Sequence, residues 1–363
     1  MLQILLIGPA LHAVSGISTH QNQLFNSELS VRFELLHFQV GGPGLKENSF
    51  QKLFRLVSNP VVFFVFLLRH RSAIVHLNTS MNHNCFWRDN VYLLIACILR
   101  LKVVCQFHGG VLPENLFPGN KLLTSLLRCL MKLPDVVVVV ARLHLDAYRR
   151  FLPGQRLELV PNAIDTSSLV AESPAAKPLG HLHMVYLGRI AENKGIFEVL
   201  DALAILVEQG RDLRLTIGGS GPDEERLQAK VNALGLNERV DFAGPVFGEA
   251  RDSLWRSCHV FVFPTYHWEG LPYALLEGMA AGAIPITTRV AGIPDVVQDG
   301  VHGLFVEAKD PVELARAIIR LDDDRVLLYR MAQTGRMRVL EHYSLGCMAD
   351  HFASIYELLG GKE

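Results

Sequence analysis

A basic, glycine-containing segment in the second half of the chain suits the binding of an anion. An apolar, strand-like run over 184–187 is followed by Gly188-Arg189-Ile190-Ala191-Glu192-Asn193-Lys194-Gly195, and a helical pattern begins at Ile196. A guanidinium and an ammonium beside a helix N-terminus add two charges to the positive end of the helix dipole. Arg189 and Lys194 are therefore candidate phosphate ligands, with a solvated loop as the alternative.

Two glutamates lie on either side of the start of a second helical pattern. Glu269 precedes Gly270 and Leu271, and Glu277 falls where the second helical turn would be. We expect the backbone N–H groups of Gly270 and Leu271 to point toward an anion, since the first turn of a helix leaves its N–H groups without partners. Each carboxylate can bind a diol, so one glutamate would hold a sugar and the other a ribose.

Parallel strands are expected to position these groups. Short apolar runs alternate with helical patterns through both halves of the chain, which predicts an α/β fold with parallel sheets wrapped by helices. Such sheets bind ligands at the carboxyl ends of their strands. The expected strands are 2–7, 33–38, 73–77, 102–107, 136–140, 182–188, 213–218, 240–243, 259–263 and 284–287.

Charge and composition divide the chain into two domains. Residues 1–165 hold 16 Lys and Arg against 9 Asp and Glu, a net +7, and the remainder holds 19 against 27, a net −8. Between them, 166–180 is rich in serine, alanine and proline, which is typical of a linker. We expect one domain over 1–165, a second domain with different partners over 181–340 and a C-terminal helix over 341–363 that crosses back to the first domain.

Several ordered motifs together resemble one enzyme family. Glu269 and Glu277 form an E-x7-E pattern, and 188–195 forms a G-R-x4-K-G pattern. Both resemble glycosyltransferase family 4 of the GT-B superfamily, and the resemblance extends over nearly the whole chain. It implies two doubly wound Rossmann-like domains facing a central cleft, with the acceptor bound by the domain over 1–165 and the nucleotide sugar by the domain over 181–340. It also implies retaining, metal-independent transfer of a hexosyl group from a nucleotide-diphosphate sugar.

The resemblance assigns roles in the second half of the chain. Arg189 and Lys194 would hold the diphosphate, Glu269 the donor-sugar hydroxyls and Glu277 the ribose. The segment 242–246 resembles the wall that faces the nucleotide base, with Val246 as the contact. The glycine-rich run over 217–222 resembles a loop of the family, although a plain tight turn is an equal alternative.

Further matches lie in the first half. Ser15-Gly16-Ile17 resembles the loop that faces the diphosphate, so the contact there would rest on Gly16. His108 follows a strand and resembles the family's cleft histidine, whereas a histidine at such a place is more often structural. Two positions depart from the pattern, because Ala163 replaces a glycine and Ala141 replaces a small hydroxyl residue.

The implied mechanism is a front-face substitution. The acceptor hydroxyl would attack from the face that the diphosphate leaves, and a phosphate oxygen would take its proton. Arg189 and Lys194 would stabilise the growing negative charge, and His108 would support the reaction centre. Glu269 would position the sugar, with a nucleophilic role as the alternative.

We expect neither a metal nor another cofactor. Asp322-Asp323-Asp324 matches the D-x-D pattern of metal-dependent transferases, but it lies between two helical patterns, where it can cap the second. The expected alternatives to a transferase are a sugar-nucleotide epimerase or a phosphorylase of the same architecture, and a non-catalytic binding protein. Nucleic-acid binding is not expected, because the basic residues are dispersed.

The expected acceptor is a glycan or a lipid-linked sugar in cell-envelope polysaccharide synthesis. Basic residues over 52–55 and 69–71 bracket the apolar run 61–68, which fits contact with an anionic membrane; a core helix with solvated flanks is an equal alternative. No run reaches the roughly 18 apolar residues of a membrane span. The six cysteines form no C-x-x-C pair, so we expect reduced core thiols in a cytoplasmic protein, with peripheral contact at the inner membrane face.

Overall fold

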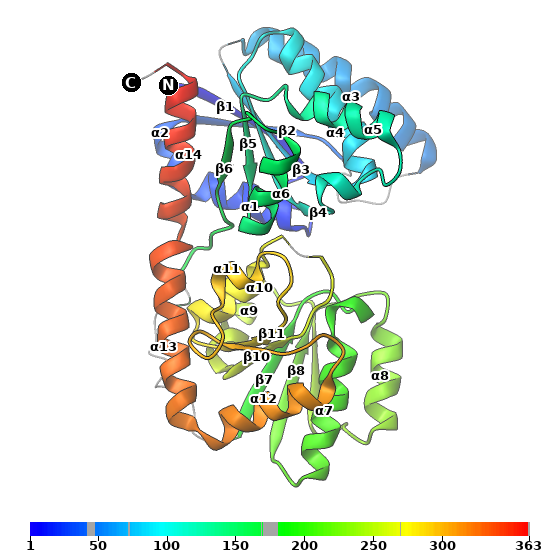
Figure 1. The fold of residues 1–363 in the computed structure, drawn as a ribbon, viewed down its shortest axis with the longest axis vertical. Helices are drawn as coiled ribbons and strands as arrows, with labels where there is room; N and C mark the ends of the chain where they lie inside the picture. The colour runs from blue at the N-terminus through cyan, green and yellow to red at the C-terminus, as the bar shows by residue number, and fades with distance from the viewer. Residues whose placement is uncertain (42–47, 72, 168, 170–180, 269, 362–363) are drawn as a thin grey trace. The chain divides into compact units, whose positions relative to one another are not determined.

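The chain folds into two compact units, each built on its own parallel sheet (Figure 1). The structure is a computed structural model that describes residues 1–41, 48–71, 73–167, 169, 181–268 and 270–361. The first unit comprises Met1–Ala163 and Leu345–Glu363, and the second comprises Ile164–Ser344. The predicted α/β class with two doubly wound sheets is confirmed.

The first unit contains a six-stranded parallel sheet with the order β2-β1-β3-β4-β5-β6. Strand β5 consists of four buried valines, as expected of a strand covered on both faces. Strand β6 is not indicated by the sequence pattern, because it has three residues and each is partly exposed. The strands are β1 (Gln3–Gly8), β2 (Glu34–Gln39), β3 (Ile74–Met81), β4 (Val103–Gly110), β5 (Val136–Val139) and β6 (Leu157–Leu159).

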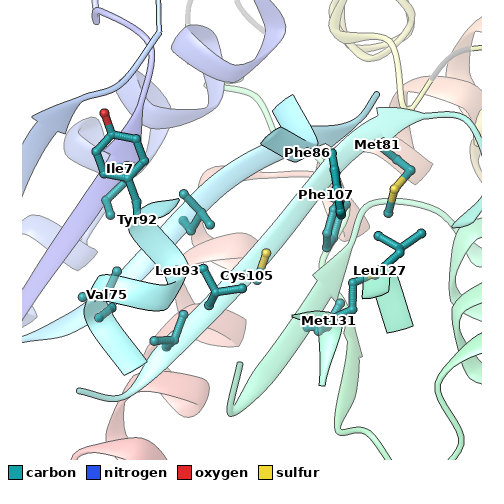
Figure 2. Packing of buried hydrophobic residues seen from close by; sticks show 14 of the residues in the cluster. Ile7, Val75, Met81, Phe86, Tyr92, Leu93, Cys105, Phe107, Leu127 and Met131 are labelled. Carbon is teal, nitrogen blue, oxygen red and sulfur yellow. The ribbon is translucent and has the colours of Figure 1, made fainter. Parts of the chain in front are cut away.

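Helices cover both faces of this sheet because successive side chains of its strands point to opposite sides. Leu5 and Ile7 of β1 pack in one core cluster, which Figure 2 shows in close-up, and Ile4 and Leu6 pack in the other. The first face carries α3 (Ser49–Arg69), α4 (His83–Ile98), α5 (Lys121–Met131) and α6 (Arg142–Phe151). The other carries α1 (Gly16–Asn26), α2 (Leu29–Arg32) and α14 (Leu345–Leu359).

The second unit repeats this plan with the strand order β12-β11-β10-β7-β8-β9. Its edge strand β12 has two residues and is too short for a sequence pattern to indicate. The strands are β7 (Leu182–Leu187), β8 (Leu213–Gly218), β9 (Val240–Gly244), β10 (Val260–Phe263), β11 (Ile284–Thr287) and β12 (Leu304–Phe305). The helices are η3 (Glu192–Lys194), α7 (Ile196–Glu208), α8 (Glu224–Ala233), α9 (Gly248–Ser257), α10 (Tyr273–Ala280), α11 (Ile293–Val296), α12 (Pro311–Asp323) and α13 (Arg325–His342).

The chain leaves the second unit at the end of α13 and returns to the first in α14. The carbonyl of Tyr343 accepts a hydrogen bond from the Ile164 amide at 3.0 Å, between the two helices. In the first unit, the Tyr356 hydroxyl of α14 lies 2.6 Å from Nδ1 of His76. Arg32 forms ion pairs with Asp350 and Glu357 of the same helix. Residues far apart in sequence thus complete the first unit.

The six cysteines form no disulfide bond with one another, and the prediction that all of them are core residues is wrong for Cys129. Cys105 and Cys258 are buried, whereas Cys129 is exposed on α5. A helix that covers a sheet has an outward side, and Cys129 lies on it although Leu130 and Met131 directly after it are apolar. None of the helices in the described part of the chain is long and apolar enough to cross a bilayer.

Candidate functional site

Backbone hydrogen bonds join the loops that follow β7, β8 and β9 in the second unit. The Gly188 amide donates to the Gly218 carbonyl at 3.1 Å, and the Gly219 amide donates to the Gly244 carbonyl at 2.7 Å. The Ile190 amide donates to the Ser220 carbonyl at 3.0 Å. The segment that carries Arg189 is therefore held in place at the carboxyl edge of the sheet.

Two glycines of the 217–222 loop permit this close approach. A Cβ atom on Gly219, which has φ +124°, would lie 1.9 Å from the Gly188 carbonyl oxygen. A Cβ on Gly221 would lie 2.0 Å from the carbonyl oxygen of Ile190. Only glycine fits at such separations, so these residues serve to pack the loop against the basic segment.

Arg189 presents its guanidinium at this edge. Its side chain is exposed and makes no ion pair or hydrogen bond with the residues that the structure describes. Its carbonyl oxygen accepts a hydrogen bond from the Tyr186 hydroxyl at 2.8 Å, which anchors the backbone. A fixed backbone with an uncommitted guanidinium is suited to a bidentate phosphate contact.

Lys194 is positioned over the end of β10. Its ammonium lies 5.9 Å from the centroid of the Phe263 ring, the last residue of that strand. The following Gly195 has φ +77°, and a Cβ there would lie 2.2 Å from the Pro264 carbonyl oxygen. The Tyr266 amide donates to the Asn193 carbonyl at 3.0 Å. The basic segment therefore packs on the β10 loop.

Helix α10 begins after Pro272 at the same edge. Glu269 lies outside the described residues, so its predicted contact with the donor sugar remains a prediction. The carbonyl of Gly270 accepts from the Gly292 amide at 3.1 Å, and the side chain of Leu271 is buried. The predicted anion contacts of the Gly270 and Leu271 amides likewise remain predictions.

Glu277 lies on the second turn of α10 and is 7% exposed. Its Oε1 pairs with Nη1 of Arg251 at 2.9 Å, and its Oε2 accepts from Nε1 of Trp255 at 3.3 Å. Burial raises the pKa of Glu277, while the Arg251 charge and the Trp255 hydrogen bond oppose the shift. Each oxygen retains lone pairs that can accept hydroxyl hydrogen bonds. The sequence motif contains no signal for these α9 partners, because only the fold brings α9 against α10.

Val246 follows β9 and contacts the end of β8. A Cβ on Gly218 would lie 3.2 Å from Cγ2 of Val246. Three strands of one sheet therefore lead to these groups: β7 is followed by Arg189 and Lys194, β9 by Val246 and β10 by α10. All of them lie at one edge of that sheet. The predicted roles of these residues are consistent with this edge and remain predictions.

In the first unit, Gly16 begins α1. Ser15 caps the helix, because its Oγ accepts from the Ser18 amide at 3.1 Å. Gly16 is exposed, and a Cβ there would meet nothing within 4 Å. Packing within the chain therefore does not require a glycine here, and the predicted diphosphate contact of Gly16 remains a prediction.

His108 lies near the end of β4 and is held by Asn78 of β3. Its Nε2 lies 2.8 Å from Oδ1 of Asn78, and Nδ2 of Asn78 donates to the His76 carbonyl at 3.4 Å. This orientation of the amide assigns the proton of His108 to Nε2 and leaves Nδ1 as an acceptor. Within the described residues, Nδ1 is buried and has no hydrogen-bond partner.

His108 belongs to a buried cluster with two further histidines. The rings of His20 and His108 meet edge to face, with centroids 4.6 Å apart. Burial, aided by the nearby His76, lowers the pKa of His108 to about 3, and burial lowers the pKa of His76 to about 3 as well. His108 is thus a neutral imidazole near pH 7. In the sequence, His76 and Asn78 alternate along one strand, and this pattern is the signal that could have indicated which residues support the His108 ring.

The three aspartates at 322–324 have structural partners. Arg211 forms ion pairs with Asp322 at 3.0 Å and with Asp323. Asp324 caps α13, because its Oδ1 accepts from the Leu327 amide at 2.8 Å, as the sequence predicts. Among the residues that the structure describes, no group of three His, Cys, Asp or Glu side chains is arranged to hold a metal ion.

Comparisons with known proteins identify the family. A family model described as "Glycosyltransferase Family 4" matches residues 29–168, and one described as "Glycosyl transferases group 1" matches residues 172–338. The alpha-D-kanosaminyltransferase of Streptomyces kanamyceticus is 33% identical over 177 residues, which cover 49% of this chain and 46% of that protein. The matched part thus spans about half the length of this curated relative.

Solved structures show the same fold. The sucrose-phosphate synthase (tll1590) of Thermosynechococcus elongatus superposes with a TM-score of 0.81 at 19% identity, and the match covers 100% of both chains. Anabaena Alr3699/HepE in complex with UDP superposes with a TM-score of 0.76 at 16% identity, over 98% of this chain and 100% of that one. The two family matches, which together extend from residue 29 to residue 338, and this shared fold place the chain in glycosyltransferase family 4, with the GT-B architecture.

Proposed function

We propose that the protein transfers a sugar from a nucleotide-diphosphate sugar to a hydroxyl of a glycan or lipid-linked acceptor. The uncommitted guanidinium of Arg189 carries the proposal, because a fixed backbone presents it at the carboxyl edge of a doubly wound sheet, the edge at which Lys194 also lies. The complex of Anabaena HepE with UDP supports a nucleoside diphosphate as the ligand. We place the reaction in cell-envelope polysaccharide synthesis.

The proposed reaction retains the configuration at the anomeric carbon. The acceptor oxygen bonds to that carbon from the face on which the bond to the diphosphate breaks, and a phosphate oxygen takes the acceptor proton. Negative charge grows on the leaving diphosphate, where Arg189 and Lys194 stabilise it more in the transition state than in the ground state. These two cations supply the positive charge that a metal ion would otherwise provide.

Neutral His108 acts as a hydrogen-bonding group in this scheme. Its lowered pKa of about 3 makes it a poor proton donor at neutral pH. Its Nε2 is committed to Asn78 and its Nδ1 is buried, so we propose that the hydrogen bond to Asn78 fixes a neutral ring near the donor sugar. In this scheme Glu269 orients the donor sugar, and Glu277 binds the ribose through the free lone pairs of a carboxylate that Arg251 and Trp255 already orient.

The first experiment measures the melting temperature with UDP, GDP, ADP and CMP. A ligand at about 100 times its Kd should add roughly 2.7 kcal/mol of stability. We expect one diphosphate to raise the melting temperature and Arg189→Ala with Lys194→Ala to abolish the shift. The matched control is Arg316→Ala with Arg320→Ala on exposed positions of α12, which should keep it. If no nucleotide shifts the native chain at millimolar concentration, the proposed donor is wrong.

The chemistry is tested separately once the nucleotide is known. NMR of the product made from the matching nucleotide sugar should show the anomeric configuration of the donor, and activity should persist in EDTA. An inverted product would contradict the front-face mechanism, and loss of activity in EDTA would contradict metal independence. A phosphorylase would instead need inorganic phosphate, and an epimerase would need no acceptor. Family membership favours neither of these two.

A further inference from the structure

Helix α3 exposes a row of apolar side chains on the outside of the first unit. Phe63 and Leu67 are buried in the core cluster, so the helix packs on the sheet by one side. The row on its other side recurs every three or four residues, which is the spacing of one helix face. The alternative prediction, a core helix with solvated flanks, is wrong for this side. The row is Phe54 (66% exposed), Val57 (68%), Val61 (62%), Val65 (45%) and Leu68 (38%).

Helices α4 and α5 continue this apolar surface. Both pack on the same face of the sheet as α3, since Leu93 and Leu127 belong to the same core cluster as Phe63. Their outward sides therefore turn the same way, and Figure 1 shows the three helices beside one another. We call the exposed apolar rows of the three helices the α3–α5 face. Its further members are Trp87, Val91, Leu94, Ile98, Leu122 and Leu126.

Positive charge accompanies this face. The segment 48–133 contains ten basic residues and two acidic ones, Asp89 and Glu114. Asp89 is buried and already bonded to Arg88 and Thr79, so it contributes little negative charge to the surface. The basic residues are Lys52, Arg55, Arg69, Arg71, Arg88, Arg100, Lys102, Lys121, Arg128 and Lys132.

Several of these cations are available to a partner. Arg69, Arg100 and Lys132 lie at or just after the C-terminal ends of α3, α4 and α5 respectively. Together with Arg71 and Lys121 they are exposed and have no ion pair with the described residues. The apolar rows thus lie beside a group of uncommitted positive charges.

We propose that the α3–α5 face docks on an anionic lipid bilayer. Apolar rows on helices that lie in the plane of a membrane insert at the headgroup boundary, and flanking Lys and Arg bind acidic headgroups. A second copy of the same face is disfavoured as the occupant, because pairing would bring the exposed cations of one copy near those of the other, namely Arg69, Arg71, Arg100, Lys121 and Lys132. An apolar face of three helices is also unusual on a surface that only meets water.

The test is co-sedimentation of the full chain with two kinds of vesicle, at low and high salt. One kind is pure phosphatidylcholine, and the other also contains roughly 30–40% phosphatidylglycerol, an anionic lipid. We expect binding to the anionic vesicles at low salt and weak binding to the neutral ones. Arg69→Glu with Arg71→Glu and Lys132→Glu should weaken binding by about tenfold or more, since each basic residue near such a surface contributes on the order of a fivefold change. Phe54→Ser with Val61→Ser and Trp87→Ser should also weaken it.

Matched variants elsewhere control for net charge and for exposed apolar area. The charge control is Arg316→Glu with Arg320→Glu and Arg330→Glu, all exposed in the second unit. The apolar control is Val31→Ser with Val326→Ser and Met337→Ser, which are 75%, 79% and 57% exposed. Both controls should bind like the native chain, and circular dichroism confirms that each variant is folded.

Three outcomes would overturn the proposal. The first is a native chain that does not sediment with anionic vesicles, and the second is face variants that bind as tightly as their controls. The third is a dimer in sedimentation velocity that the face variants abolish, which would make a second copy the occupant. The face belongs to the unit without Arg189 and Lys194, so vesicle binding and nucleotide binding can fail independently.

Discussion

At the scale of residues, the two nitrogens of His108 have different roles. Nε2 donates to Asn78, and Asn78 is itself oriented by the His76 carbonyl. Nδ1 remains an acceptor in a site where burial keeps the ring neutral. Asn78 is therefore a positioning residue, because it acts on the proposed sugar contact only through His108.

Replacing Asn78 by Asp should change the pH dependence of activity. A carboxylate beside Nε2 raises the pKa of His108, so the ring becomes protonated at a higher pH than in the native chain. Protonation places a positive charge near the anomeric carbon, where positive charge also develops as the diphosphate leaves, and kcat should therefore decline on the acid side at a higher pH. Steady-state kinetics from pH 5 to about pH 8 with a saturating donor would check this, in the range where histidine commonly titrates. An unchanged profile would contradict a role for neutral His108.

At the scale of elements, the basic segment depends on how closely two loops approach. Gly195 lies between η3 and α7, with the Pro264 carbonyl where a side chain would be. A side chain there must push the β10 loop away from the loop that carries Lys194. The glycine thus lets the loop of Lys194, a proposed phosphate ligand, pack directly on the loop that follows β10.

Gly195→Ala should destabilise the chain by about 2 kcal/mol or more and weaken nucleotide binding. Part of this cost is the strain of a left-handed residue, on the order of 1 kcal/mol, and the rest is the clash with the carbonyl. Gly210→Ala isolates the first part, because Gly210 has φ +76° and nothing within 4 Å of its Cβ position. Urea unfolding and nucleotide titration of both variants measure the difference. Equal effects at the two positions would show that the contact with Pro264 has no energetic role.

At the scale of the whole molecule, the first unit joins distant parts of the chain around buried histidines. His20 comes from α1, His76 from β3 and His108 from β4, and α14 contributes Tyr356 and Phe352. Burial is the leading cause that lowers the pKa of each of these three histidines. The native fold therefore holds three neutral imidazoles that become protonated more readily once the chain unfolds.

We expect the stability of the chain to fall as the pH drops below about 6.5, the pKa of an unfolded histidine. The folded-state pKa values are lower, so the unfolded state binds more protons, and the loss continues down to about pH 3. Each histidine contributes at most about 1.4 kcal/mol per pH unit. Urea unfolding at pH 7 and at about pH 4.5, a pH between the folded and unfolded histidine pKa values, measures how steeply the free energy of unfolding changes with pH. His20→Leu should make it shallower, and His351→Leu on the exposed side of α14 should not; equal slopes would refute the prediction.

Sequence patterns predicted most of the fold because local order along the chain determines it. Apolar strand-like runs that alternate with helical patterns indicate parallel sheets, because two parallel strands need a crossover connection and that connection is usually a helix. The patterns did not indicate β6 and β12, which have three and two residues and depend on pairing with a neighbouring strand. The D-x-D pattern was correctly interpreted as containing a helix cap, since capping is a local interaction.

The sequence by itself determined which residues are candidates for the chemistry, because charged and glycine residues in ordered motifs are read directly from the chain. Arg189, Lys194 and Glu277 are identified in this way. The tertiary structure alone determined their partners: Arg251 beside Glu277, Asn78 beside His108, and the outward side of α3. These contacts join segments that are distant along the chain, and exposure depends on which side of a helix the core covers. Contacts between distant segments leave no periodic signal, and α3 is apolar on both sides, so its sequence does not indicate which side the core covers.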